Sequence, residues 1–347
     1  MEFAMGGRLD IRITPSDVGK RVSVRSLTGP EEPAARFTDT VGRLSSWTDG
    51  VLSITRRTGA SVRIDETDVV AGKVVPQARP RGRGLTATPV SELTAVAGRG
   101  WPAVEQEPSG GWTLRASSGF TARGNSVLVL GDPDLPLADA VAHTEQWYER
   151  RGLTPRFQVT PADEALDSLL AARGWERERP AVLRVGPLDA VVRQEAPLPE
   201  GASASLATRP DERFLRLYGR TLTARKAAEE VLATPPPGGC VHLLTVTGRD
   251  GATLAVGRCS VDGRWAGFAA IEVAPEARRR GLATAVMRRL AEAALQDGAS
   301  GGYLQVEPGN HAAGALYDRL GFTPHHEYAY RTRTSPGRVP AGAPGEA

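Results

Sequence analysis

Residues 271–284 read IEVAPEARRRGLAT: an apolar, strand-like run, a turn, three consecutive arginines and a glycine. Apolar residues then recur at helical spacing from Leu282 to Gln296, and Gly298 follows as a stop signal, so a helix is predicted there. The first N–H groups of a helix have no partner within it and attract anions. Arginines at a helix start oppose the helix dipole, so an anionic ligand explains them better than a ligand-free basic loop. The stretch therefore predicts a pyrophosphate site.

The segment around this turn predicts a mixed sheet flanked by helices. Glycine-containing turns join its central strands in the manner of hairpins. The expected strands are 204–209, 241–246, 253–261, 265–273, 303–306 and 328–331, and the expected helices are 211–219, 224–233, 282–296 and 311–320.

An internal repeat links this segment to the one before it. Residues 157–175 align without a gap to residues 304–322, with Gln158 opposite Gln305. A similar strand and helix precede both copies, so duplication explains the match better than two independent strand–turn–helix units. The copies differ where chemistry is expected: Leu170 stands opposite Tyr317, Thr160 opposite Glu307 and Asp163 opposite Asn310.

The N-terminal segment, residues 10–76, predicts a small antiparallel β-barrel, because short alternating strands are separated by turn residues. On this pattern it resembles an SH3-like barrel, a fold that carries many functions. A structural or dimerisation module is favoured over capture of a peptide or nucleic acid. Residues 76–84, rich in proline, glycine and arginine, predict a linker.

Composition excludes several classes of protein. With 347 residues, 40% hydrophobic and 24% charged, the chain is typical of a soluble globular protein of several domains. It has neither a membrane-length apolar run nor a signal peptide at its start. The net charge of +3 is too small to argue for nucleic-acid binding. Cys240 and Cys259 provide no disulfide framework, so a reducing, cytoplasmic location is expected.

Two motifs resemble those of the GNAT N-acetyltransferases. The pyrophosphate loop of that superfamily reads Gln/Arg-x-x-Gly-x-Gly/Ala, and here it is Arg278-x-x-Gly281-x-Ala283. A second motif, Asn-x-x-Ala-x-x-Leu-Tyr-x-x-x-Gly-Phe, is matched by Asn310, Ala313, Leu316, Tyr317, Gly321 and Phe322. Both occur in the right order within residues 200–333, which makes the resemblance specific.

The resemblance implies an α+β fold, a small antiparallel β-barrel followed by two GNAT-like mixed β-sheet lobes flanked by helices. The barrel spans 10–76, a degenerate lobe without a CoA loop spans 85–190, and the catalytic acetyltransferase lobe spans 202–334. The middle lobe resembles a worn copy because residues 131–136, Gly-Asp-Pro-Asp-Leu-Pro, replace its phosphate loop.

The resemblance also implies acetyl-CoA as co-substrate. Tyr317 matches the tyrosine that protonates the departing CoA thiolate, although a core-packed aromatic is the alternative. The residues implied in cofactor binding are Ile271, Val273, Arg278, Arg279, Arg280, Gly281, Leu282, Ala283, Thr284 and Asn310.

The general base is left open. Some family members carry a glutamate at the position of Gln305, which cannot take up a proton. Glu307 lies two residues further on the same strand face, and Glu272 lies beside the thioester strand, so both are candidates besides a water chain. His325 and His326 are further candidates for the base, although adjacent residues of a strand are expected to point to opposite faces. They have no partners at metal-ligand spacing, so no metal is expected.

The predicted function is acetyl-CoA-dependent N-acetyl transfer to a primary amine of a small molecule, such as an amino acid, a metabolite or an amine antibiotic. A protein N-terminus or lysine is the alternative acceptor. A non-catalytic acyl-CoA-sensing or binding protein is the alternative of another class. Besides the amine, no membrane or nucleic-acid partner is expected, and a homodimer is left open. The helices at 211–233, which should shape the acceptor pocket, carry no recognisable signature.

Overall fold

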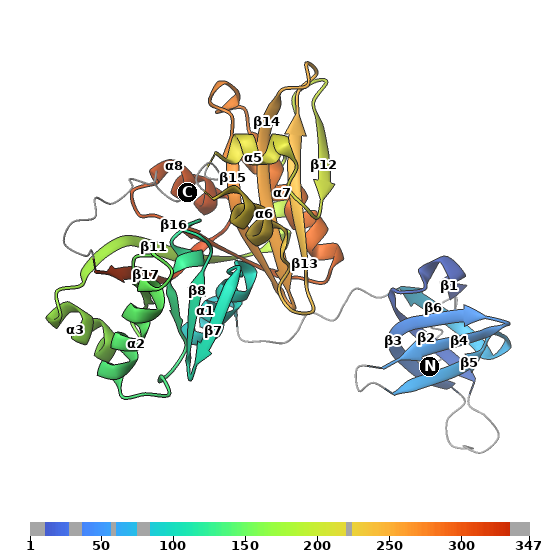
Figure 1. Ribbon diagram of the computed structural model, residues 1–347. Helices are drawn as coiled ribbons and strands as arrows, with labels where there is room; N and C mark the ends of the chain where they lie inside the picture. Colours follow the sequence, from blue (N-terminus) through green and yellow to red (C-terminus); the bar gives the residue numbers. More distant parts are fainter. Residues whose placement is uncertain (1–10, 28–36, 57–59, 75–83, 220–223, 334–347) are drawn as a thin grey trace, which may run out of the picture. The chain divides into compact units, whose positions relative to one another are not determined.

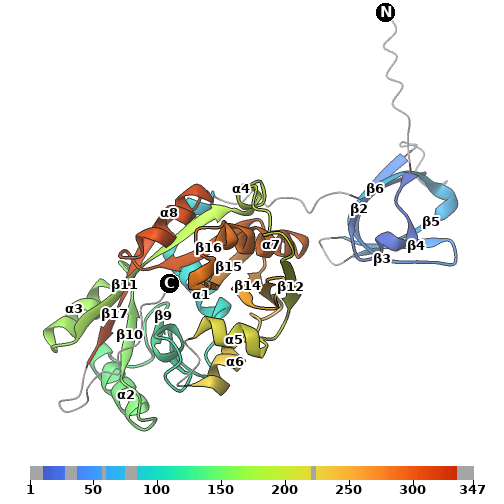
Figure 2. The ribbon, with the colours of Figure 1, turned by 90° about the horizontal axis from the view of Figure 1, so that it is seen from above.

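A computed structural model describes residues 11–27, 37–56, 60–74, 84–219 and 224–333. Contacts within the chain divide it into two units, Met1–Arg81 and Gly82–Ala347 (Figures 1 and 2). The linker expected at 76–84 lies outside the described residues except for Gly84. In the described part of the chain, no helix is long and apolar enough to cross a membrane.

The N-terminal unit is built from short strands that follow the alternating pattern of the sequence. Its elements are β1 (Ile11–Arg12), η1 (Pro15–Asp17), β2 (Arg21–Leu27), β3 (Phe37–Thr48), β4 (Val51–Thr55), β5 (Ser61–Asp65), η2 (Glu66–Asp68) and β6 (Val69–Val74). The strands form one sheet in the order β1-β6-β2-β3-β4-β5. Neighbours are antiparallel except β1 and β6, which run parallel. The antiparallel strands predicted for the small barrel are confirmed as a small antiparallel sheet, and β1 was not predicted.

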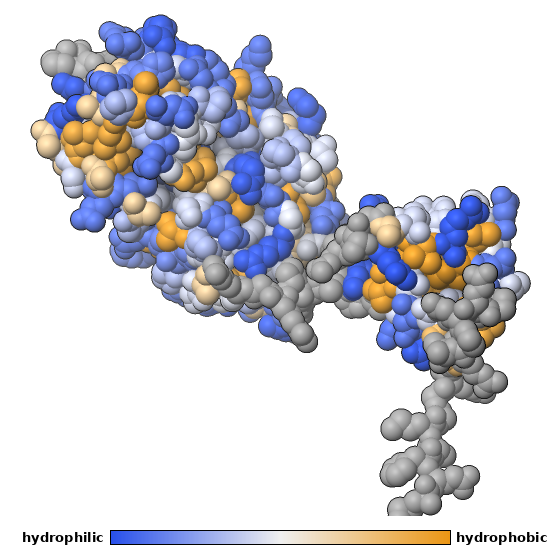
Figure 3. Space-filling model, turned by 90° about the horizontal axis from the view of Figure 1, so that it is seen from below, coloured by the Kyte–Doolittle hydropathy of each residue, from blue (hydrophilic) through white to orange (hydrophobic). Residues whose placement is uncertain are grey.

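One face of this sheet forms the core of the unit. Val22, Val24, Leu52 and Ile54 are fully buried at alternate positions of β2 and β4, because successive side chains of a strand point to opposite faces. Figure 3 shows apolar side chains gathered on one face of this unit. Its exposed large apolar residues are Val18, Leu27, Phe37, Val41 and Val74. The role of the unit as a structural or dimerisation module stays a prediction.

Over residues 84–219 and 224–333, the second unit forms one mixed sheet. Its strands are β7 (Glu105–Ser109), β8 (Trp112–Ala116), β9 (Val127–Val129), β10 (Arg156–Val159), β11 (Glu176–Pro187), β12 (Ser203–Ala207), β13 (Cys240–Thr247), β14 (Thr253–Asp262), β15 (Trp265–Val273), β16 (Gly301–Val306) and β17 (Thr323–Thr332). All eleven lie in the order β12-β13-β14-β15-β16-β11-β17-β10-β9-β8-β7.

Helices cover both faces of this sheet. They are α1 (Val90–Gly100), α2 (Leu137–Glu149), α3 (Glu164–Ala172), α4 (Leu188–Val192), α5 (Glu212–Tyr218), α6 (Arg225–Ala233), α7 (Leu282–Gln296) and α8 (His311–Arg319), with short 3-10 turns η3 (Leu85–Ala87), η4 (Arg123–Asn125) and η5 (Pro275–Ala277). Around β13 to β16, α4, α7 and α8 bury one set of apolar side chains. The other face is covered by α5 and α6, with α1 nearby over β11 and β16.

The two sequence repeats have the same element order. In the first, β7, β8, β9, α2, β10, α3 and β11 follow one another, and in the second β13, β14, β15, α7, β16, α8 and β17 do so. This agreement supports the duplication inferred from the sequence. Of the first repeat, α1 and the β7–β8 hairpin were not predicted.

The repeats meet by exchanging their last strands. β11, which ends the first repeat, lies between β16 and β17 of the second and pairs antiparallel with both. β17, which ends the second repeat, lies between β11 and β10. Residues 85–190 and 202–334 therefore share one continuous sheet (Figure 2).

Candidate active site

The turn between β15 and α7 leaves a helix start open to the surroundings. Arg279 and Gly281 both adopt left-handed backbone conformations, with φ of 60° and 77°. A Cβ added at Gly281 would meet nothing within 4 Å, so the glycine borders open space. Gly281 directly precedes α7. No side chain caps the start of this helix, and its first turn carries no acidic residue. These N–H groups are arranged to bind an anion.

The arginines of the turn add positive charge at this point. The side chains of Arg278, Arg279 and Arg280 are exposed. Arg278 Nε donates a hydrogen bond of 3.3 Å to the carbonyl oxygen of Val273, which ties the turn to the end of β15. The cluster therefore combines backbone donors with exposed positive charge.

Strands β15 and β16 separate beside this turn. They pair in parallel only from Trp265 to Phe268, opposite Gly301 to Leu304. Further along, β15 pairs with β14 alone, and β16 pairs with β11. A bulge accompanies the separation: Ala270 has φ of 53°, and the register with β14 shifts between Val256 and Arg258. The β16-facing edge of residues 269–273 is thus left to pair with an extended ligand, as an added strand does.

Tyr317 lies on α8, in the apolar core that this helix shares with α4 and α7. Its side chain is 6% exposed, and its ring centroid lies 6.2 Å from that of Phe322. Burial, and secondarily the charge of Glu272, raises the pKa of the phenol to about 12, while Arg184 opposes the shift. The hydroxyl therefore keeps its proton at neutral pH and can donate it. The ring also packs in the core.

Asn310 has a local role that the sequence analysis missed. Its Oδ1 accepts a hydrogen bond of 3.1 Å from the N–H of Ala313 and caps α8. Asparagine is among the preferred N-cap residues, so the position could have been identified from the sequence. Its contact with a cofactor stays a prediction.

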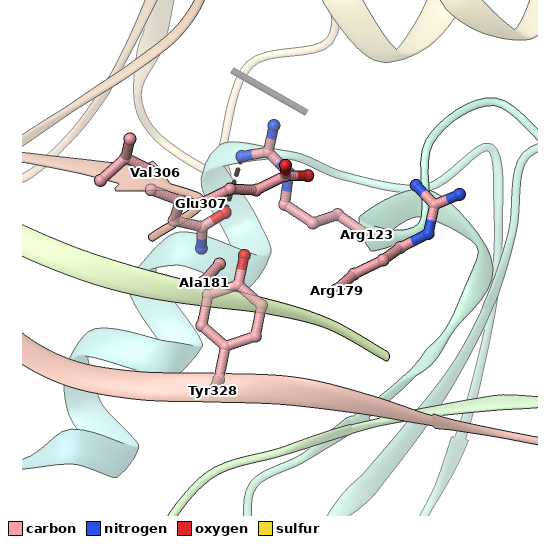
Figure 4. Close-up of a pocket in the computed structure, with 7 residues that line it drawn as sticks. Arg123, Arg179, Ala181, Val306, Glu307 and Tyr328 are labelled. Carbon is pink, nitrogen blue, oxygen red and sulfur yellow. Dashed lines mark hydrogen bonds between the residues drawn. The ribbon is translucent and has the colours of Figure 1, made fainter. Parts of the chain in front are cut away.

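A shallow hollow with room for about one water molecule lies where β16 ends (Figure 4). It is lined by Arg123, Arg179, Ala181, Gln305, Val306, Glu307 and Tyr328. Gln305, Val306 and Glu307 all line it, and Glu307 follows the last residue of β16, so the shared strand face of Gln305 and Glu307 stays a prediction. Gln305 Oε1 accepts a hydrogen bond of 2.7 Å from Arg123 Nη1, so this glutamine orients a guanidinium group.

Sequence reasoning missed the residues that the first repeat contributes to this hollow. Arg123 comes from η4, and Arg179 comes from a bulge in β11, where its φ is 47° and the register shifts between Glu178 and Ala181. Tyr328 comes from β17. A single arginine in a loop, such as Arg123, has no recognisable motif around it. Arg179 reaches the hollow because β11 pairs with strands of the second repeat, and this strand exchange was not predicted.

The expectation for the two histidines was wrong. His325 Nδ1 and His326 Nδ1 lie 2.8 Å apart, so the rings meet instead of pointing to opposite faces. The reason is a bulge: Leu183 pairs with His326 while the next residue, Arg184, pairs with Pro324, which leaves His325 without a register partner.

The corresponding turn of the first repeat is occupied by its own hairpin. The N–H of Gly110 donates to Asp134 Oδ2 and that of Gly111 donates to the carbonyl of Asp132, both at 2.6 Å. Leu170, opposite Tyr317 in the repeat, is fully buried in an apolar cluster. This repeat therefore lacks both the open turn and the hydroxyl.

Comparison with known proteins agrees with this arrangement. Residues 88–331 match the family described as probable histone acetyltransferase Rv0428c C-terminal, and residues 16–73 match the Rv0428c N-terminal Sm-like domain. The N-terminal unit is therefore Sm-like, and the more specific SH3-like assignment is not confirmed.

Similar proteins cover most of the chain. It is 31% identical over 330 residues to the "Probable histone acetyltransferase Rv0428c" of Mycobacterium tuberculosis, across 92% of this chain and 97% of that protein. It is 30% identical over 252 residues to the "Uncharacterized N-acetyltransferase YobR" of Bacillus subtilis, across 70% of this chain and 98% of that protein. A GCN5-related N-acetyltransferase from Kribbella flavida shares the fold, with a TM-score of 0.54 at 15% identity over 74% of this chain and 98% of that one. The chain therefore belongs to the Rv0428c family of GNAT N-acetyltransferases and is an acetyltransferase with an N-terminal Sm-like domain.

Proposed function

We propose that the chain transfers the acetyl group of acetyl-CoA to a primary amine at the gap between β15 and β16. The observation that carries the proposal is that one part of the fold holds three features: the start of α7 without a side-chain cap, the end of β15 that no longer pairs with β16, and the hydroxyl of Tyr317 in the core shared with α7. The first suits a pyrophosphate, the second an extended pantetheine arm and the third a departing thiolate.

The cofactor would lie along β15 and the turn. Its pyrophosphate accepts hydrogen bonds from the backbone of Arg279 to Thr284, with Arg278 beside it. Its pantetheine arm pairs with the backbone of Ile271 and Val273. A backbone amide of this edge polarises the thioester carbonyl and stabilises the oxyanion of the tetrahedral intermediate.

The chemical step is an acyl transfer from sulfur to nitrogen. The neutral amine attacks the thioester carbonyl, and the intermediate collapses to an amide and the CoA thiolate, which Tyr317 protonates. The proton of the amine passes to a carboxylate. The charge of Glu272 acts on Tyr317 and Glu307 lines the hollow, which supports either carboxylate as the group that receives the proton, directly or through water.

The hollow favours a small acceptor that carries both charges. Figure 4 shows the guanidinium groups of Arg123 and Arg179 and the carboxylate of Glu307 lining one space. A carboxylate group of the acceptor pairs with the arginines, and its ammonium group approaches Glu307 before deprotonation. An amino acid is the simplest molecule with this pattern.

A protein lysine or N-terminus is the second candidate acceptor. It is favoured by the relative whose name reads probable histone acetyltransferase and which matches 92% of this chain. The ammonium group of a lysine side chain would use the carboxylate of Glu307, but it has no carboxylate of its own to pair with the arginines.

The test measures release of free thiol from acetyl-CoA with a panel of amines. The panel contains amino acids, polyamines, amine antibiotics and a lysine-rich peptide. Turnover with an amino acid supports the first acceptor class, and turnover with the peptide alone supports the second. Tight CoA binding by calorimetry without turnover for any amine indicates a non-catalytic acyl-CoA-binding protein and contradicts the proposal.

A further inference from the structure

A cluster of metal-binding side chains lies at the far end of α7 from the acetyl-CoA turn. Cys240 and His242 occupy alternate positions at the start of β13, so their side chains share one face of the sheet. Asp297 is the C-cap residue of α7. With 15 residues in α7 and about 1.5 Å of rise per residue, the cluster and Gly281 are separated by about 22 Å along the helix.

The three side chains converge on one point. His242 Nε2 lies 2.6 Å from Asp297 Oδ2, Cys240 Sγ lies 3.1 Å from the same oxygen, and Cys240 Sγ lies 3.6 Å from His242 Nε2. One sulfur, one nitrogen and one oxygen therefore form a closed triangle. We propose that this triangle is a binding site for a zinc-class divalent cation, held by Cys240, His242 and Asp297 with water as the fourth ligand.

The dimensions of the triangle suit such a cation. Zinc lies about 2.3 Å from sulfur and about 2.0 Å from nitrogen or oxygen, so tetrahedral ligand atoms are about 3.3 to 3.6 Å apart. The sulfur–nitrogen edge already has this length, and the two edges to Asp297 need to widen by less than about 1 Å. The side chains of His242 and Asp297 are 20% and 39% exposed, which leaves a path for the cation and for the water.

The arrangement differs from that of a nucleophilic cysteine. In a cysteine–histidine–carboxylate relay, one ring nitrogen faces the thiol and the other faces the carboxylate. Here both partners approach Nε2 of His242. Convergence on a single nitrogen is what ligands around a common cation require.

The end of α7 adds a reason for positive charge at this place. Backbone carbonyl groups at a helix C-terminus carry partial negative charge and favour cations. The carboxylate of Asp297 stands at that end, where the helix dipole disfavours it unless a cation compensates. Thiolate and imidazole ligands together favour zinc over magnesium or calcium. Binding releases the thiol proton of Cys240 to solvent and joins the start of β13 to the end of α7.

The expected absence of a metal is therefore revised by this proposal. On sequence alone, neither the pair Cys240 and Cys259 nor the pair His325 and His326 indicated a metal site. Cys240 and His242 are close in sequence, but Asp297 is 57 residues away from Cys240, so only the fold brings the third ligand to them.

The test is a titration of the purified full-length chain with Co²⁺, after treatment with a chelator. We expect one Co²⁺ per chain, with the near-ultraviolet charge-transfer absorption of a cobalt–thiolate bond and the visible bands of tetrahedral cobalt, both displaced by Zn²⁺. Cys240→Ala should abolish the charge-transfer absorption. His242→Ala and Asp297→Asn should weaken binding at least about tenfold, because even outer-shell changes have effects of this size.

Cys259→Ala is the matched control. The chain has two cysteines, so a thiolate signal comes from one of them. Cys259 is fully buried and stands in register with His242 on β14, outside the triangle, and its removal should leave the spectrum unchanged. Absence of the signal in the wild type, its persistence in Cys240→Ala, or its loss in Cys259→Ala overturns the proposal. Should Cys240→Ala fail to fold, the exposed Asp297→Asn decides through loss of the Zn²⁺-dependent rise in Tm.

Discussion

Arg123 Nη1 donates a hydrogen bond of 2.7 Å to Gln305 Oε1, and this contact joins the two sequence repeats at the hollow. The corresponding glutamine of the first repeat, Gln158, accepts a hydrogen bond of 3.0 Å from Arg115. Arg123 is also held from the side, because its guanidinium group lies 4.4 Å from the centre of the Trp101 ring. Gln305 cannot accept a proton, but it sets the position of a cationic group beside Glu307.

Arg123→Met should raise the KM for the amine acceptor and leave the KM for acetyl-CoA unchanged. Loss of a hydrogen bond between charged groups costs about 1.5–3 kcal/mol, or roughly ten- to a hundredfold in affinity. Steady-state kinetics with the best acceptor of the panel measures the effect. Arg193→Met is the control, since that side chain, at the C-cap of α4, is 68% exposed and pairs with Asp189. An unchanged acceptor KM in Arg123→Met would contradict the role of the hollow.

Gly281→Glu should abolish CoA binding while the fold is retained. The new side chain enters the open space at the start of α7 and places negative charge where a pyrophosphate would bind. Calorimetry with CoA measures the affinity. Gly263→Glu is a matched control: Gly263 also has positive φ, 56°, and a Cβ there meets nothing within 4 Å. Both variants carry a similar backbone strain of about 1–2 kcal/mol, so CoA binding lost in both would point to strain.

Tyr317→Phe should lower kcat roughly ten- to a thousandfold, as expected for loss of a general acid, with little change in the KM for acetyl-CoA. Single-turnover thiol release isolates the step. Tyr303→Phe removes another buried hydroxyl, which donates at 3.4 Å to the carbonyl of Val96, and should leave kcat unchanged. Wild-type kcat in Tyr317→Phe would leave the tyrosine with its packing role alone.

CoA should saturate at one molecule per chain. In the first repeat, Asp132 and Asp134 accept hydrogen bonds from the β7–β8 turn at the place where the pyrophosphate would bind. Asp134→Asn should therefore leave both the stoichiometry and kcat unchanged. Equilibrium titration with two equivalent sites per chain would show that the duplication kept both cofactor sites.

Stability should fall on acidification through the protonation of His326. Burial, and secondarily the neighbouring His325, lowers the pKa of His326 from 6.5 to about 4. The unfolded chain therefore binds the proton more readily than the folded chain. The contribution of neutral His326 to the free energy of unfolding is fully present above pH 6.5 and is lost as the pH drops towards 4, by at most about 3 kcal/mol. Urea unfolding at pH 7 and pH 4.5 measures the loss. His326→Gln should reduce that difference, and an equal loss in the variant would assign it to other groups.

Local features of this protein could be predicted from its sequence. The strand that ends at Val273, the helix that follows Gly281 and the helix that carries Tyr317 all appear as expected, because hydrophobic periodicity and turn residues act over short distances. The repeat was visible for the same reason, since equivalent positions need equivalent side chains. The cap of α8 by Asn310 was equally local and was missed.

The tertiary structure alone decided the exchange of β11 and β17 and everything that depends on it. Strands pair through backbone hydrogen bonds, which depend little on residue type, so the sequence of a strand does not specify which strand lies next to it. Burial of the apolar faces of the whole sheet selects the neighbour. Arg123 and Gln305 are 182 residues apart, and Cys240 and Asp297 are 57 apart. The hollow and the triangle of Cys240, His242 and Asp297 are therefore products of long-range packing, whereas the turn predicted to bind an anion arises from neighbours in the chain.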